Sequence, residues 1–132
     1  MKHTLIVMLL AGSASAADAP ARRLYEVVTE TGMPHLEWNL RHAVVTETRC
    51  LSEAELATVF WMMRDVSLQD CTLVPQDRQA LRLLCTGGHG TSGQAHWQWD
   101  TTPIRGTLDV RLGGKNMTFW QRVAARDLGA CR

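Results

Sequence analysis

Apolar and polar residues alternate over much of the second half of the chain, which is the pattern of β-strands that bury one face. The alternation is regular over residues 94–99, 107–112 and 117–122, and glycine-rich turn sequences separate the runs. Two further apolar runs, 71–74 and 80–85, flank a turn and are typical of a hairpin. Because short strands joined by tight turns pair antiparallel, the pattern predicts an antiparallel sheet from residue 71 onward.

The first half of the chain predicts two strands and one helix. Residues 23–29 are β-prone, and residues 35–48 begin with apolar residues at every second position. Ser52 and Glu55 then form a capping box, in which each side chain is placed to satisfy a backbone N–H group of the other residue. Apolar residues recur at helical spacing after it, which predicts an amphipathic helix from Glu53 to about Arg64.

Together these elements predict an α+β domain that is mainly β. We expect an antiparallel sheet of roughly six to seven strands that is strongly curved or partly closed. The single short helix is expected to follow the second strand.

The N-terminus has the three parts of a cleavable export signal. Residues 2–3 are basic, residues 5–10 are apolar, and Ala14-Ser15-Ala16 is a small-residue cleavage site. We expect removal of residues 1–16, which leaves residues 17–132 as one domain. The apolar part is too short to span a bilayer, and no later stretch reaches the roughly 20 apolar residues that a span needs. The sequence thus predicts a domain in the periplasm of a Gram-negative bacterium, without a membrane span.

The chain has four cysteines, and an even number in an exported domain predicts disulfides. A metal site is disfavoured because no Cys-x-x-Cys pair is present. Four cysteines allow three pairings, and the sequence alone does not choose among them. Geometry favours Cys71 with Cys85, because these residues end the two arms of the predicted hairpin, where opposed Cβ atoms come within bonding range. That choice leaves Cys50 with Cys131, which would tie the C-terminus to the corner before the helix.

The charge balance limits the partners that we expect. The chain carries 14 Lys and Arg residues against 13 Asp and Glu residues, and its formal net charge is +1. Removal of Lys2 with the signal brings that charge to about zero. Phosphate recognition needs a basic excess on one face, so we expect no nucleic-acid partner. No polybasic segment for a membrane surface is present either.

Several short motifs follow one another in a recognisable order. They are Leu24-Tyr25-Glu26-Val27, Gly32-Met33-Pro34, Cys50-Leu51-Ser52-Glu53, Cys71, Cys85 with Gly87-Gly88, and Gly129-Ala130-Cys131. In this order the chain resembles the small secreted bacterial proteins that are classed as a four-cysteine domain of unknown function. It departs at Phe60-Trp61-Met62-Met63, which is more apolar than expected, and at Leu83, where a tryptophan is expected. The resemblance implies a periplasmic β-rich domain with no established activity.

Nucleotide and metal sites are both disfavoured by spacing. Gly88 to Gly93 match Gly-x-Gly-x-x-Gly, but a dinucleotide site places this motif before a helix, and here a strand is predicted to follow. Imidazole and thioether ligands suit copper, but no His-x-His or Met-x-x-Met spacing recurs. We therefore predict no cofactor and no metal site. The residues considered for copper are His35, His42, His89, His96, Met33, Met62, Met63 and Met117.

Enzymatic arrangements are also disfavoured. Ser92, His96 and Asp100 offer the residue types of a hydrolase triad. However, alternation places His96 and Asp100 on the solvent side of a strand, and no Gly-x-Ser-x-Gly elbow is present. The acidic residues considered for a catalytic carboxylate pair are Glu26, Glu37 and Asp109, whose separation the sequence does not define. We therefore predict a protein that is not an enzyme.

Five tryptophans are many for a chain of this length. Alternation places Trp38, Trp97 and Trp99 on inward faces, where core packing is their ordinary use. Trp120 is expected to face outward because its neighbour Phe119 faces inward, and Trp61 is expected to be exposed on its helix. Exposed tryptophans often mark binding surfaces, and the aromatic-lined concave side of a curved sheet can accept an apolar ligand. The residues predicted to bind a ligand or partner are Trp61, Trp120 and Trp99.

The leading hypothesis from the sequence is a non-enzymatic periplasmic binding or interaction module. Its expected partner is a small apolar ligand or an unidentified periplasmic protein. A structural accessory protein of the cell envelope is the second hypothesis, and a periplasmic handler of copper or another metal is the third.

Overall fold

The structure, a computed structural model, describes residues 21–33, 42–60, 71–86, 90–114 and 117–132. Seven strands and one short helix lie in these ranges. In chain order they are β1 (Arg22–Gly32), β2 (His42–Ser52), α1 (Glu53–Leu56), β3 (Cys71–Pro75), β4 (Ala80–Cys85), β5 (Ser92–Gln98), β6 (Ile104–Leu112) and β7 (Met117–Ala130).

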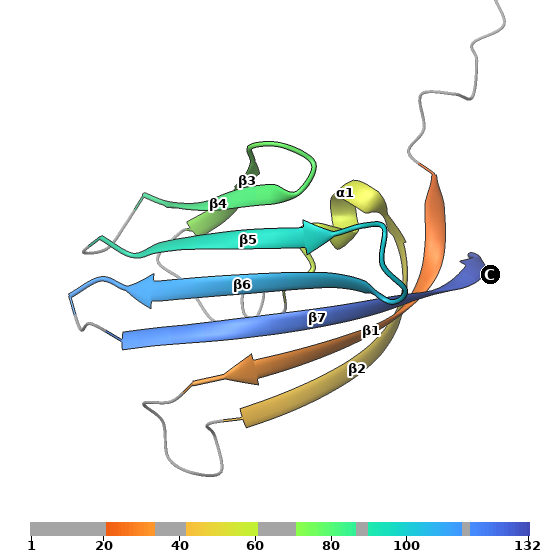
Figure 1. Ribbon diagram of the computed structural model, residues 1–132, viewed down its shortest axis with the longest axis horizontal. Helices are drawn as coiled ribbons and strands as arrows, with labels where there is room; N and C mark the ends of the chain where they lie inside the picture. The colour runs from red at the N-terminus through yellow and green to blue at the C-terminus, as the bar shows by residue number, and fades with distance from the viewer. Residues whose placement is uncertain (1–20, 34–41, 61–70, 87–89, 115–116) are drawn as a thin grey trace, which may run out of the picture.

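The strands form a single antiparallel sheet that curves into a half-barrel (Figure 1). Its order is β2-β1-β7-β6-β5-β4-β3, so β3 to β7 form a meander and the β1–β2 hairpin adds to the last strand. The first strand therefore pairs with the last, with Arg23 opposite Ala130 and Gly32 opposite Trp120. The prediction of a curved antiparallel sheet with one helix after the second strand is confirmed.

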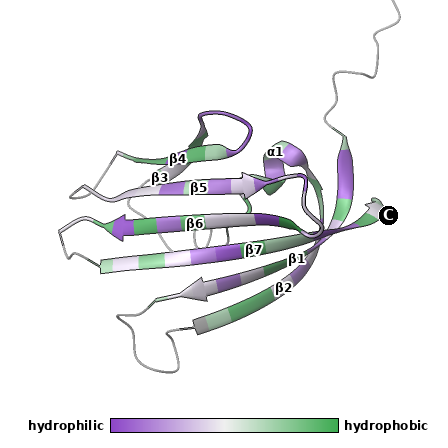
Figure 2. Ribbon diagram, viewed as in Figure 1, coloured by the Kyte–Doolittle hydropathy of each residue, from purple (hydrophilic) through white to green (hydrophobic). Residues whose placement is uncertain are grey.

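Alternation along each strand divides the sheet into an apolar inner face and a polar outer face. Hydrophobic and hydrophilic residues follow one another along β6 and β7 (Figure 2). On β6, Leu108 and Val110 are buried, whereas Thr107 and Asp109 are exposed. The inner face forms one hydrophobic core with α1 and the residues after it. The core consists of Tyr25, Val27, Leu51, Leu56, Val59, Phe60, Leu81, Leu83, Ala95, Trp97, Leu108, Val110, Phe119, Val123 and Ala125.

The capping box predicted for the helix is present, but the helix is shorter than predicted. The hydroxyl of Ser52 accepts from the backbone N–H of Glu55 at 3.1 Å, and the Glu55 carboxylate accepts from the N–H of Ser52 at 3.3 Å. The expected continuation of the helix is wrong over residues 57–60, because α1 ends at Leu56, and residues 61–64 lie outside the described residues. Thr58 and Val59 are β-branched and favour leaving the helix. Val59 and Phe60 then enter the core, with exposed fractions of 5% and 0%.

Other predictions fall partly or wholly outside the described residues. The expected strand over residues 35–48 is found only as β2, which runs from His42 to Ser52, and residues 34–41 with Trp38 lie outside. The export signal lies outside as well, and so does Trp61. Among the residues that the structure describes, no helix is long and apolar enough to cross a membrane.

Both predicted disulfides are confirmed. Cys71 and Cys85 are register partners across β3 and β4, and their sulfur atoms are bonded. Cys50, near the end of β2, is bonded to Cys131, which follows β7. The second bridge therefore ties the two strands that flank β1.

Two tryptophans of the sheet lie directly over glycines on the neighbouring strand. Trp97 is opposite Gly106 on the inner face, and a Cβ atom on Gly106 would lie 2.7 Å from the indole ring. Trp120 is opposite Gly32 on the outer face, and its ring occupies the space that a Cβ atom on Gly32 would need. Because glycine has no side chain, each glycine leaves room for an indole ring to pack against the backbone of the neighbouring strand.

Candidate functional site

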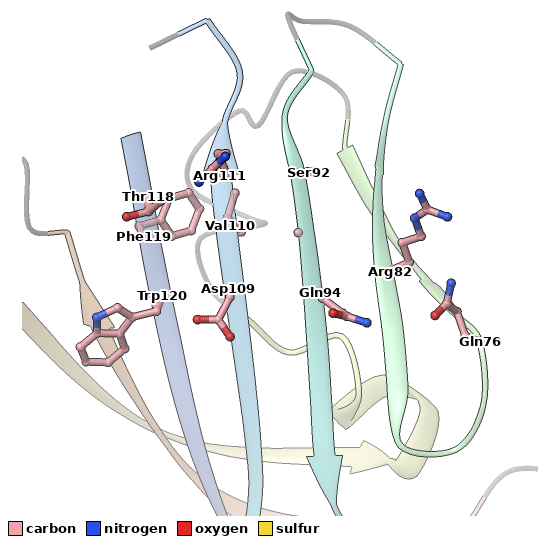
Figure 3. A pocket seen from close by; sticks show the side chains of 11 residues that line it. Gln76, Arg82, Ser92, Gln94, Asp109, Val110, Arg111, Thr118, Phe119 and Trp120 are labelled. Carbon is pink, nitrogen blue, oxygen red and sulfur yellow. The ribbon is translucent and has the colours of Figure 1, made fainter. Parts of the chain in front are cut away.

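The outer face of the sheet holds a polar hollow of about 630 Å³ across β4 to β7. A row of register partners crosses it: Arg82 is opposite Gln94, Gln94 is opposite Asp109, and Asp109 is opposite Trp120. Figure 3 shows the Asp109 and Gln94 side chains between the arginine on one side and the indole on the other. The row forms because each of these residues has the outward orientation on its own strand.

Trp120 points outward as predicted, but it is partly buried. One side of its ring lies over Gly32 of β1, and the guanidinium carbon of Arg122 lies 4.5 Å from the ring centroid. An arginine at this distance makes a cation–π contact. The indole is therefore held between a backbone and a cation, and it offers a ligand less of its face than an exposed tryptophan would.

A second hollow, of about 640 Å³, lies at the end of the half-barrel where α1 and the β3–β4 turn meet. We call it the end groove. Its walls are more apolar than those of the polar hollow, since aromatic and aliphatic side chains form most of them. These side chains are Tyr25, Ala54, Ala57, Pro75, Leu81 and Trp99.

Trp99 extends the core into the end groove. Its ring is stacked on that of Trp97, with centroids 5.0 Å apart and planes at 14°. Trp97 in turn contacts Phe60, with centroids 5.6 Å apart, and its indole N–H donates to the carbonyl of Ala57 at 3.0 Å. The indole N–H of Trp99 donates to the carbonyl of Arg78 at 2.6 Å. Because stacking fixes one face and this bond fixes the edge, Trp99 presents a rigid aromatic surface at the groove.

Charged pairs form the rim of the end groove. Arg78 of the β3–β4 turn lies 3.0 Å from Glu53 of α1, which joins two segments on either side of the groove. Arg23 of β1 lies 3.1 Å from Asp127 of β7. All four side chains are about half exposed, so each pair contributes little to stability and mainly sets the charge of the rim.

These contacts shift the pKa values of the rim groups. The hydrogen bond from Arg23, followed by that from the backbone N–H of Gly129, holds the pKa of Asp127 below its ordinary value. The backbone N–H of Ser52 lowers the pKa of Glu55 in the capping box. Burial raises the pKa of the Tyr25 hydroxyl. At neutral pH the rim therefore carries both signs of charge, and the Tyr25 hydroxyl stays protonated.

Acidification is expected to weaken the fold through the two carboxylates whose pKa is lowered. A group with a lowered folded-state pKa contributes stability above its unfolded pKa, and that stability is lost as the pH falls through the folded pKa. Replacing Arg23 by alanine should raise the pKa of Asp127 towards its ordinary value, as followed by NMR titration of the carboxyl carbon. Arg105→Ala, on the outer face of β6, is the control. An unchanged titration of Asp127 in the Arg23 variant would contradict the assignment.

The structure separates the tryptophans predicted to form the binding site. Trp99 lines the end groove and Trp120 lines the polar hollow, while Trp61 lies outside the described residues. The sequence did not identify Tyr25, Leu81 or Arg78 as groove residues. Inward alternation marks the first two only as core, and the turn that contains Arg78 gives no sign that it meets α1.

The enzymatic arrangements considered from the sequence are not assembled. Ser92 and His96 share one strand and lie four positions apart, which is about 13 Å in an extended chain. Glu26 is opposite Arg126 on β7 and Asp109 is opposite Trp120, so these carboxylates are about 20 Å apart. Glu37 lies outside the described residues. Among the residues that are described, no group of three His, Cys, Asp or Glu residues is placed to hold a metal ion.

Comparison with known proteins gives no relative. No family model matches the chain, and neither the curated proteins nor the solved structures contain a similar one. The resemblance to four-cysteine exported proteins therefore stays a prediction from the order of the motifs.

Proposed function

We propose that this chain is a non-enzymatic binding module of the periplasm that takes a small apolar ligand into the end groove. The observation that carries the proposal is the end groove itself, in which the partly buried Trp99 lies beside the core residues Tyr25 and Leu81.

The size and lining of the end groove support this function. Small-molecule sites commonly have volumes of about 300 to 1,000 Å³ and mostly apolar walls with a few polar groups. The end groove, at about 640 Å³, falls in this range and has charged residues only at its rim. The ring of Trp99 is already fixed by Trp97 and Arg78, so little side-chain entropy is lost when a ligand stacks on it.

The polar hollow fits this role less well. Its floor is a row of exposed polar side chains, and the cation–π contact with Arg122 occupies part of the Trp120 ring. An apolar ligand placed there would desolvate Arg82, Gln94 and Asp109 without giving them new partners, which is costly.

A fluorescence titration tests the proposal. The full chain, with both disulfides formed, is titrated with N-phenyl-1-naphthylamine, an apolar probe whose emission rises when it leaves water. We expect saturable binding and energy transfer from tryptophan to the probe. Trp99→Ala should weaken binding about tenfold or more, because it removes the central aromatic contact.

Trp120→Ala is the matched control, since it removes one tryptophan from the other hollow. Its affinity for the probe should stay within about twofold of the parent value. Absence of saturable binding to the parent chain would overturn the proposal and favour a purely structural role. Equal loss of affinity in both variants would place the site elsewhere and would also overturn it.

A further inference from the structure

The sheet is open, and its two edges differ. Within the described part of the chain, β2 pairs only with β1 and β3 pairs only with β4. The β3 edge is short, ends in Pro75, and is fixed to its neighbour by the Cys71–Cys85 disulfide. Short strands and proline are ordinary protections against further pairing. The β2 edge has neither of these two protections.

The β2 edge is long and regular. Its eleven residues pair with β1 without a register shift and include no proline, glycine or lysine. The run from Val44 to Thr48 is rich in β-branched residues, which favour pleated pairing. Val44 is 56% exposed on the outer face. Figure 1 shows β2 along the border of the sheet, with β1 on one side only. A strand of this kind presents a row of backbone N–H and C=O groups to a partner strand.

We propose that the β2 edge pairs antiparallel with β2 of a second copy of this chain, about a two-fold axis at Thr48. In this register Thr48 faces its own counterpart, and Val44–Ser52 of one copy lies along the same segment of the other. The two inner faces then continue as one surface. A two-fold interface uses the same surface on both copies, so each contact occurs twice.

The charged residues on β2 favour a second copy as the partner, and they favour this register. Glu47 and Arg49 lie on the inner side of β2, one on each side of Thr48, and both are partly buried. The axis at Thr48 places Glu47 of each copy opposite Arg49 of the other, which gives two cross-strand ion pairs. An axis at Glu47 or at Arg49 would place like charges opposite each other, and such pairs are destabilising.

The residues on the outer side of β2 are also compatible with the proposed dimer. Thr48 is exposed there and lies opposite Thr48 of the other copy, and two threonines opposite each other form a favourable cross-strand pair. Thr46, which is also exposed, lies opposite Cys50. Val44 would lie opposite Ser52 and lose its exposed apolar surface. Since a single strand pair buries less than the roughly 1,200 Å² of a standard interface, we expect a weak dimer.

Charge reversal with complementation tests the pairing. In sedimentation experiments over roughly 1 µM to 1 mM, the parent chain should show reversible dimerisation. Glu47→Arg alone and Arg49→Glu alone should each be monomeric, because each places like charges together twice. A mixture of these two variants should form heterodimers, since both ion pairs are then restored. The double variant Glu47→Arg/Arg49→Glu should dimerise with itself.

Two controls distinguish the pairing from damage to the fold. Arg105→Glu reverses a charge on the outer face of β6 and should leave the dimer unchanged. Circular dichroism should show β-structure in every variant. The Arg49 variants need this control because Arg49 also contributes to the lowered pKa of Glu55 in the capping box of α1. A parent chain that stays monomeric throughout the range would overturn the proposal. Variants that do not restore dimers on mixing, while folded, would overturn the register and the choice of partner strand.

Discussion

Replacing Cys50 and Cys131 together by serine is expected to lower the free energy of unfolding by about 4 to 5 kcal/mol. The bridge closes a loop with a sequence separation of 81 residues, so its loss returns a large conformational entropy to the unfolded chain. It also holds β2 and the end of β7 together around β1. Chemical denaturation followed by fluorescence measures the change.

The hairpin disulfide provides the matched comparison. Replacing Cys71 and Cys85 by serine should cost about 3 kcal/mol, because the separation is only 14 residues. The hairpin bridge also lies at an edge, where β3 pairs only with β4 among the described strands. If the hairpin variant were the less stable of the two, loop entropy would not be the dominant contribution of these bridges.

Replacing Gly106 by valine is expected to destabilise the protein by about 3 kcal/mol or more. A Cβ atom at this position would lie 2.7 Å from the ring of Trp97, which is only 2% exposed. The ring has little room to move, because it is stacked on Trp99, contacts Phe60 and is hydrogen bonded to Ala57. Thermal unfolding by circular dichroism measures the loss.

A neighbouring substitution and a double-mutant cycle give this prediction its controls. Thr107→Val places the same side chain on the outer face of β6, where it should change the free energy of unfolding by less than about 0.5 kcal/mol. Gly106→Ala combined with Trp97→Leu should cost less than the two single changes added together, because the smaller side chain makes room for the methyl group. Simple additivity would show that the glycine is required for another reason.

The elements that the sequence predicted well depend on neighbours in the chain. Alternation on β6 and β7 identifies their inward faces, and the capping box depends on Ser52 and Glu55 alone. The hairpin disulfide follows from a symmetric turn between Cys71 and Cys85. In each case the contacts span few residues, so the sequence pattern contains them.

The features that could not be predicted from the sequence depend on contacts between residues that are distant in the chain. The end groove exists because the turn at Arg78 meets α1 at Glu53 and because Trp99 stacks on Trp97 at the same end. Trp120 is half buried because β7 pairs with β1, which brings it over Gly32. The early end of α1 has in part a similar cause, since burial of Phe60 in the core adds to the low helix propensity of Thr58 and Val59.

The position of β7 between β1 and β6 determines when the sheet can assemble. Without β7, the β1–β2 hairpin and the β3–β6 meander have no strand in common, and neither can complete the inner face. A chain that is synthesised from its N-terminus therefore stays in two unjoined parts until β7 is available. Such long-range closure makes folding slow compared with local hairpins. The C-terminal strand thus completes the sheet, because it joins the two parts that precede it in the chain.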